Sequence, residues 1–219
     1  MLASKHNVDD MEWTLSPIAP AAQPYLRLQR YRVEHERFDG GMAVVERDVL
    51  ALGEVAAVLA VDPRHDEFIM IEQFRIGAAS AGAASAGAAP VVSDPTTPWL
   101  LELVAGTLEP GEAIEALARR ELQEEAGLEA ARVETVLSYL SSPGVTSERV
   151  HVLVAEIDSR QAGGLHGCAH EGEDIRVTVQ PVSAVAELIA NPRCGNSLTL
   201  IGLLWLQANY ADLKARWLA

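Results

Sequence analysis

The chain has few cysteines and no long apolar run, and both absences narrow the classes of protein to which it can belong. Only Cys168 and Cys194 occur among 219 residues, too few for a disulfide framework or for a zinc site built from paired C-x-x-C motifs. No apolar run approaches the roughly 20 residues that span a bilayer. The first ten residues are polar and lack the apolar core of a signal peptide. We therefore expect a cytoplasmic protein with reduced cysteines and no membrane partner.

Basic residues are also scarce. Seventeen Lys and Arg residues stand against 31 Asp and Glu residues, which gives a formal net charge of −14. Such a chain offers no basic surface that would attract a polyanionic backbone, so we expect no nucleic-acid partner. Hydrophobic residues make up 49% of the chain, enough for a buried core in one large or two small domains.

The order of the apolar segments predicts an α+β fold. Alternating residues at 25–33 and an apolar, β-branched segment at 42–50, separated by an Asp-Gly turn, predict a β-hairpin. Mixed strands followed by two C-terminal helices favour an α+β sandwich over a doubly wound parallel sheet. The expected later strands are 55–61, 68–72, 99–105, 133–140, 150–156 and 175–179, and the expected helices are 112–126, 184–190 (capped by Ser183) and 197–217 (capped by Asn196 or Ser197).

A tract of small residues interrupts this pattern. The sequence Ala-Ala-Ser-Ala-Gly occurs twice from residue 78 and contains no large apolar side chain. Gly82, Gly87 and two following prolines argue against a helix, because an interior glycine costs about 1 kcal/mol relative to alanine. We interpret residues 78–95 as a mobile, low-complexity insertion without a chemical role.

One segment, GTLEPGEAIEALARRELQEEAGL, predicts a strand, a tight turn and a helix. It begins with Gly106 at the end of a strand, and Glu-Pro-Gly forms the turn. Glu112 starts the helix, where a carboxylate suits the positive end of the helix dipole, and Gly127 ends it. Arg120 lies eight residues after Glu112, just over two helical turns, so these side chains can form an ion pair that positions the helix against its loop.

Three carboxylates share one face of this helix. Glu121, Glu124 and Glu125 lie at positions i, i+3 and i+4, within about 5–6 Å of one another. Their mutual repulsion raises a pKa unless a positive charge lies among them. Oxygen ligands without nearby His or Cys favour Mg²⁺, with Mn²⁺ as an alternative, and Mg²⁺ commonly binds substrate phosphates. A solvated acidic helix face is the alternative interpretation for an isolated E-x-x-E-E sequence.

The segment satisfies every position of the pattern G-x5-E-x7-R-E-U-x-E-E-x-G-U, where U is aliphatic, and it therefore resembles the Nudix hydrolases. The chain from about Tyr25 onward is most similar to the bacterial ADP-ribose pyrophosphatases. Pro143 lies fifteen residues after Leu128, an acidic loop follows at 166–174, and a Trp-containing helix lies near the C-terminus. The resemblance implies a Nudix α/β/α sandwich with a mixed sheet (55–219), preceded by a small antiparallel β region (1–54).

The implied activity is Mg²⁺-dependent hydrolysis of the pyrophosphate of ADP-ribose to AMP and ribose 5-phosphate, by a homodimer with exchanged N-terminal strands. Another nucleoside diphosphate sugar, such as GDP-mannose, stays open as the substrate, as does a non-catalytic ADP-ribose sensor. The implied metal ligands are Glu121, Glu124, Glu125, Glu173 and the carbonyl of Ala105. The implied catalytic residues are Glu171 as general base, Glu173 and Arg120; the substrate-binding residues are Arg47, Arg75 and Glu148; and the structural residues are Gly106, Glu112, Gly127 and Pro143.

Several points stay open within this resemblance. His170 is an alternative proton acceptor, and Glu173 competes with Glu171 for the role of base. Arg75 has the alternative role of a surface ion pair with Glu72. The insertion is longer than the family leads us to expect, and Arg47-Asp48 replaces a more usual Arg-Glu pair, which bears on the choice of substrate.

Overall fold

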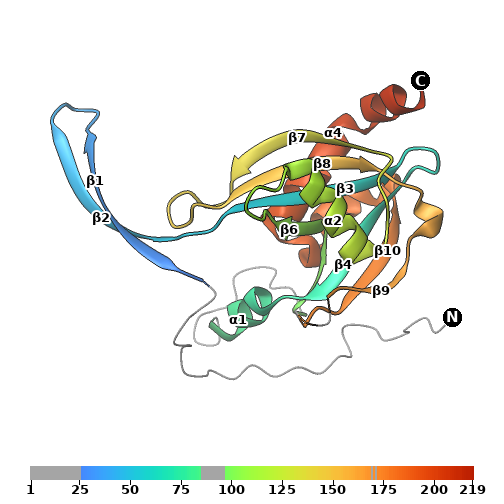
Figure 1. The fold of residues 1–219 in the computed structure, drawn as a ribbon, viewed down its shortest axis with the longest axis horizontal. Coiled ribbons are helices and arrows are strands. Elements are labelled where there is room, and N and C mark those ends of the chain that lie inside the picture. The colour runs from blue at the N-terminus through green and yellow to red at the C-terminus, as the bar shows by residue number, and fades with distance from the viewer. Residues whose placement is uncertain (1–25, 85–96, 169, 171) are drawn as a thin grey trace.

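A computed structural model describes residues 26–84, 97–168, 170 and 172–219 (Figure 1). Within these ranges, no helix is long and apolar enough to cross a membrane. The strands are β1 (Leu28–Glu36), β2 (Met42–Leu50), β3 (Glu54–Asp62), β4 (Glu67–Phe74), β5 (Trp99–Glu102), β6 (Val104–Thr107), β7 (Arg132–Leu140), β8 (Arg149–Glu156), β9 (Gly164–His166) and β10 (Ile175–Pro181). The α-helices are α1 (Ile76–Ala84), α2 (Ile114–Ala126), α3 (Val185–Ala190) and α4 (Ser197–Leu218), with short 3₁₀ turns at Ser159–Gln161, Val182–Ala184 and Pro192–Cys194.

An eight-stranded mixed sheet forms the centre of the main domain. Its strand order is β7-β8-β3-β4-β10-β9, with β5 beside β4 and β6 beside β3. Strands β3 and β8 are parallel, and the other paired strands are antiparallel. Ala57 of β3 lies between Ala105 of β6 and Val152 of β8, which places the start of the glutamate-rich segment at the middle of the sheet.

Helices cover both faces of this sheet, as the α/β/α prediction requires (Figure 1). Helix α2 packs on one face through Leu117 and Leu122, which are buried against β3, β4 and β10. Helices α3 and α4 pack on the other face, where Leu203 and Trp217 join the second core. Strands β3 and β8 are buried on both faces, and alternate residues of each strand join the two cores, because successive strand residues point to opposite faces.

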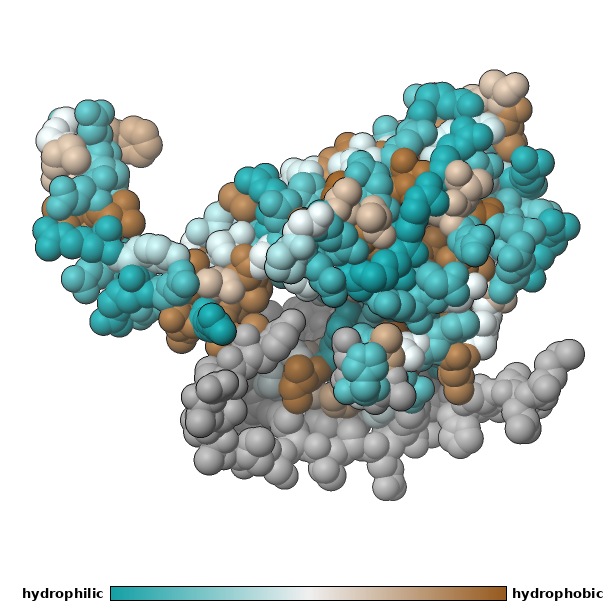
Figure 2. Space-filling model, in the orientation of Figure 1, coloured by the Kyte–Doolittle hydropathy of each residue, from teal (hydrophilic) through white to brown (hydrophobic). Residues whose placement is uncertain are grey.

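Strands β1 and β2 form a separate hairpin that projects from the main domain (Figure 1). The hairpin carries exposed apolar side chains, among them Leu28, Phe38, Met42 and Val44. Figure 2 shows several of them as brown patches on this arm. A two-stranded hairpin is marginally stable on its own in water. A second protein surface that covered these apolar side chains would therefore stabilise the hairpin.

The insertion is the first of several places where the structure corrects the sequence prediction. Residues 78–84 belong to helix α1, whereas we expected no helix there, and residues 85–96 lie outside the described part. The Arg75 carbonyl accepts the amides of Ala78 and Ala79, and Ala79 is only 2% exposed. Burial of this alanine and the high helix propensity of its neighbours offset the cost of the glycines.

The other corrections concern strand and helix ends. The predicted strand 99–105 is two strands, because the chain steps from β4 to β3 at Leu103, whose amide donates to the Thr199 hydroxyl at 3.3 Å. Strand β9 was not predicted. Ser183 does not cap α3, which begins after Ala184 without a side-chain cap, whereas Asn196 caps α4 as expected.

Candidate active site

The loop before α2 holds the helix in place through an ion pair. Glu112 lies two residues before the helix and does not start it as we predicted, and its carboxylate accepts the Glu109 amide at 3.1 Å, which closes the turn. Arg120 Nε donates to Glu112 Oε1 at 3.0 Å, as the spacing predicted. At the other end, Gly127 has φ +66° and donates its amide to the Gln123 carbonyl at 3.0 Å. The loop and both helix ends are therefore fixed by residues of the motif itself.

Arg120 also lies among the carboxylates, a contact that the sequence did not predict. Its Nη1 donates to Glu121 at 2.8 Å and to Glu124 at 3.0 Å. Hydrogen bonding to Arg120 lowers the pKa of Glu112. A guanidinium thus relieves part of the repulsion that we had assigned to a cation alone.

Glu125 is the most buried carboxyl group of this helix. Its side chain is 3% exposed, and Oε2 accepts the Ala105 amide at 2.9 Å. Burial raises its pKa to about 8, against the lowering effect of the Ala105 hydrogen bond, and the charges of Glu121 and Glu173 add to the rise. Burial likewise raises the pKa of Glu121, opposed by Arg120. The site brings carboxyl groups together where burial disfavours their ionised forms.

A glycine makes room for one of these carboxylates. A Cβ atom on Gly106 would lie 1.8 Å from Glu121 Oε1, far inside van der Waals contact. Only a residue without a side chain allows strand β6 to approach α2 this closely. The requirement for glycine at the first position of the motif therefore has a steric cause.

Glu173 reaches the site from a loop that is tied to the end of α2. The Gly167 amide donates to the Glu124 carbonyl at 3.2 Å, and the Cys168 amide donates to Glu173 Oε2 at 3.0 Å. The His166 ring packs against Gly127, where an added Cβ atom would lie 2.5 Å from the ring. Glu171, the residue expected to be the base, lies outside the described residues.

These residues fit a divalent metal ion. Every side-chain donor in the group is a carboxylate oxygen, the type of ligand that Mg²⁺ and Mn²⁺ prefer. The raised pKa of the buried Glu125 indicates that its ionised form requires a positive partner. Gly106 leaves space that lets the Glu121 carboxylate face the strand. Burial and donor chemistry therefore agree on a hard cation.

Arg75 lies near this carboxylate group, and its ion-pair partner is Glu102 rather than Glu72. Its Nε donates to Glu102 Oε2 at 2.6 Å, whereas Glu72, the partner considered from the sequence, pairs with Arg176 and Arg193. The charge of Arg75 acts on Glu125, whose pKa it lowers. A cavity of about 380 Å³ opens here, lined by Gln73, Phe74, Arg75, Trp99, Gly172, Glu173 and Asp174.

Glu102 is a residue of this site that the sequence analysis missed. It follows the apolar residues Trp-Leu-Leu at the end of β5 and is buried. A charged side chain at the end of a buried strand was the available signal.

The remaining predicted substrate residues, Arg47 and Glu148, lie on other segments than the glutamate-rich helix. Arg47 is exposed on β2 of the projecting hairpin, opposite Tyr31 of β1. Glu148 directly precedes β8. The loop that carries it and Pro143 is bonded to the base of the hairpin, where Leu50 donates to the Val145 carbonyl at 2.8 Å.

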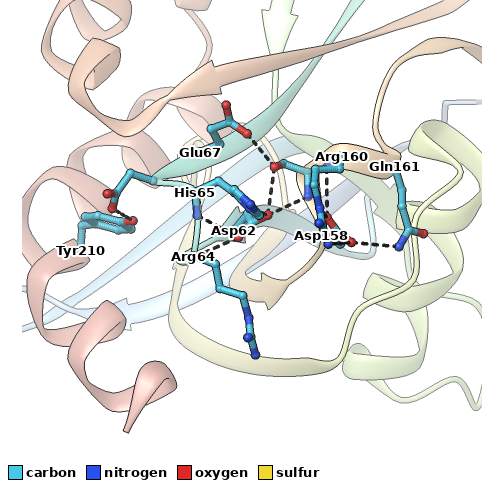
Figure 3. A network of polar contacts seen from close by, with 10 residues as sticks. Asp62, Arg64, His65, Glu67, Asp158, Arg160, Gln161 and Tyr210 are labelled. Atoms are coloured by element: carbon cyan, nitrogen blue, oxygen red, sulfur yellow. Dashed lines mark hydrogen bonds and ion pairs between the residues drawn. The ribbon is translucent and has the colours of Figure 1, made fainter.

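A second acidic group lies outside the motif, at the turn between β3 and β4 (Figure 3). Among the described residues, only Asp62, His65 and Asp158 place three potential ligand atoms within 4.8 Å of one another. The Asp62 carboxylate already accepts the amides of Arg64, His65 and Ser159. These bonds explain the burial of Asp62 as turn structure, because a buried carboxylate needs such partners.

Comparison with known proteins agrees with the family resemblance found in the sequence. Residues 52–193 match the NUDIX domain family. The chain is 41% identical over 194 residues to an ADP-ribose pyrophosphatase of Haemophilus influenzae, which covers 88% of this chain and 85% of the relative. An ADP-ribose pyrophosphatase of Escherichia coli strain K12 matches at the same identity, covering 88% and 87%.

Two further proteins are more distant. A GDP-mannose pyrophosphatase of Escherichia coli O139:H28 is 28% identical over 186 residues, covering 85% of this chain and 90% of the relative. A crystal structure of an ADP compounds hydrolase superposes with a TM-score of 0.61 at 20% identity, covering 89% and 92% of the two chains. This last likeness shows a shared fold.

Proposed function

The chain belongs to the NUDIX domain family, and on that basis we propose that it hydrolyses the pyrophosphate of ADP-ribose to AMP and ribose 5-phosphate. The observation that carries the proposal is the buried Glu125 carboxylate beside Glu121 and Glu173. The choice of substrate follows the relatives named ADP-ribose pyrophosphatase, which are 41% identical to this chain. Another nucleoside diphosphate sugar is the second candidate, since the GDP-mannose pyrophosphatase matches at 28%.

The residues that would hold the metal are Glu121, Glu124, Glu125 and Glu173, with the carbonyl of Ala105. Mg²⁺ is the proposed ion and Mn²⁺ the alternative. When bound, the ion supplies Lewis-acid stabilisation of the charge that develops on the pyrophosphate oxygens. Arg120 is bonded to two of the four glutamates and to Glu112, so it orders this ligand set rather than the substrate.

Side chains of the protein accept a proton from the attacking water and bind the phosphates. A water oxygen bonds to phosphorus in line with the bridging oxygen, whose bond to phosphorus breaks. A side chain of the loop that follows β9 accepts the proton of that water. Glu171 and Glu173 are the candidate acceptors and His170 is the third. Arg75 offers its guanidinium to the phosphates from the wall of the cavity that Glu173 also lines.

The projecting hairpin supports a homodimer with exchanged N-terminal strands. Its apolar side chains, including Leu28 and Met42, are exposed in the single chain. In an exchanged dimer they would be covered, and Arg47 would reach the other subunit's substrate while Glu148 lies at the hairpin base. We therefore retain residues 1–54 as a dimerisation region and 55–219 as the catalytic domain. Light scattering should give twice the 23.5 kDa chain mass; the monomer mass would refute the dimer.

A glutamate substitution on α2 tests the proposed function. Glu124→Gln should lower the Mg²⁺-dependent kcat for ADP-ribose roughly 100-fold, about 2.7 kcal/mol, because one ligand charge is lost. Glu115→Gln, an exposed glutamate on the same helix, should stay within about twofold as the matched control. Equal activities for both variants would contradict the assignment. Binding of ADP-ribose without turnover by the unmodified protein would favour the non-catalytic ADP-ribose sensor. The cytoplasmic location of the protein remains a prediction.

A further inference from the structure

A partly buried chain of polar contacts connects Arg75 to the start of α4. Glu102 is 6% exposed, and its two carboxylate oxygens have different partners. Oε2 accepts Arg75 Nε at 2.6 Å, and Oε1 accepts Asn196 Nδ2 at 2.8 Å. Asn196 is itself fixed, because its Oδ1 accepts the Thr199 amide at 2.9 Å as the N-cap of α4. The chain of contacts connects the start of a 22-residue helix to the Arg75 guanidinium.

Arg75 stands where its side chain needs such support. It follows β4 and precedes α1, and it lines two cavities. One is the cavity of about 380 Å³ shared with Glu173, and the other, of about 670 Å³, lies between α1 and the α3–α4 junction. A long side chain beside open space loses up to about 2 kcal/mol of rotamer entropy when it is immobilised. A partner that already restrains it lowers the entropy lost on binding substrate.

The Arg75–Glu102 ion pair restrains the arginine and still leaves it able to bind a phosphate. A guanidinium has five N–H donors in a planar fork, so a contact through Nε to Glu102 leaves other donors for a phosphate. Burial raises the pKa of Glu102, and the charge of Arg75 opposes that rise. Glu102 is therefore a charged partner whose burial depends on the arginine, and the two side chains act as one unit.

We propose that Glu102, held by Asn196, is a positioning residue that orients Arg75 toward the pyrophosphate of the substrate. The inference rests on the function proposed above for the contact between Arg75 and phosphate. Neither Glu102 nor Asn196 belongs to the glutamate-rich motif.

The structure provides a closely matched control for Glu102. Glu156 on β8 is also buried, and its Oε2 accepts Arg132 Nε at 2.7 Å. The side-chain exposures of the Arg132–Glu156 pair are 45% and 9%, compared with 41% and 8% for Arg75 and Glu102. Glu156→Gln therefore removes the same kind of buried charge from an ion pair outside the proposed site.

A double-mutant cycle tests the proposal. Glu102→Gln should lower kcat/KM for ADP-ribose about 10- to 30-fold when Arg75 is present, and change it less than about twofold in an Arg75→Ala background. Glu156→Gln should leave kcat/KM within about twofold. Equal losses from Glu102→Gln in both backgrounds, or a similar loss from Glu156→Gln, would overturn the proposal in favour of a general structural role.

A binding measurement separates this inference from the proposed function. Calorimetry with inorganic pyrophosphate and Mg²⁺ gives the same cycle without turnover, and Glu102→Gln should weaken binding about tenfold only when Arg75 is present. Thermal unfolding first confirms that each variant folds. If ADP-ribose is not hydrolysed but the binding cycle holds, the proposed function fails and the positioning role stands. If hydrolysis occurs and the binding cycle is additive, only the positioning role fails.

Discussion

Replacing Glu125 with glutamine should stabilise the metal-free protein at alkaline pH and at the same time remove its metal-dependent activity. The carboxyl is 3% exposed, and burial raises its pKa from 4.5 to about 8. This difference corresponds to a penalty of roughly 4–5 kcal/mol for ionising the folded protein. Glutamine has nearly the same shape, and its oxygen can still accept the Ala105 amide.

The sign of the pH dependence follows from proton binding. Below pH 4.5 the Glu125 carboxyl is protonated in both the folded and the unfolded chain. Its ionisation then costs the folded protein nothing, and the free energy of unfolding is highest with respect to this group. Between pH 4.5 and about 8 the unfolded chain releases its proton first, and stability falls by up to about 1.4 kcal/mol per pH unit. Above pH 8 the loss is complete.

Thermal unfolding in EDTA at pH 5, 7 and 9 measures this effect. The unmodified protein and Glu125→Gln should agree within about 1 kcal/mol at pH 5, and the variant should unfold roughly 10–20 °C higher at pH 9, given about 2–4 °C per kcal/mol for a chain of this size. Glu124→Gln, which alters a half-exposed neighbour, is the control and should show a much smaller gain. Parallel pH curves for the unmodified protein and Glu125→Gln would refute the reasoning.

Glycine substitutions give three further predictions. Gly106→Ala should reduce kcat at least tenfold, since its Cβ atom would displace the Glu121 carboxylate, whereas Gly144→Ala, with open space around its Cβ position, should have no such effect in the same assay. Gly127→Ala should destabilise the protein by about 1–3 kcal/mol in urea unfolding, because φ is +66° and the added Cβ atom meets a histidine ring. Gly77→Ala, inside α1 with free space, should stabilise it by up to about 1 kcal/mol, and a loss of stability would contradict the helix.

The sequence predicted most of the fold because its main elements have a clear period or clear end signals. The hairpin, the core strands and α2 appear close to the expected residues, and Asn196 caps α4. Helix α1 was missed because burial of Ala79 depends on tertiary packing, which composition does not encode. The break at Leu103 depends on a contact with Thr199, 96 residues away.

The same limit applies to the site. The motif predicted the Glu112–Arg120 ion pair, because both residues lie within a segment of regular helical spacing. It did not predict that Arg120 also contacts Glu121 and Glu124, since side-chain rotamers choose among several partners at similar spacing. Glu102 was missed because its contact with Arg75 joins two segments that lie 27 residues apart in the chain.

Hydrolysis of ADP-ribose with and without Mg²⁺ is the measurement that tests the central claim most directly. ADP-ribose and GDP-mannose should be offered at equal concentrations, with release of AMP and GMP followed by chromatography in Mg²⁺ and in EDTA. We predict rapid formation of AMP and ribose 5-phosphate that EDTA abolishes, with a higher kcat/KM for ADP-ribose. Turnover that persists in EDTA, or no turnover of either compound by the folded protein, would contradict the account.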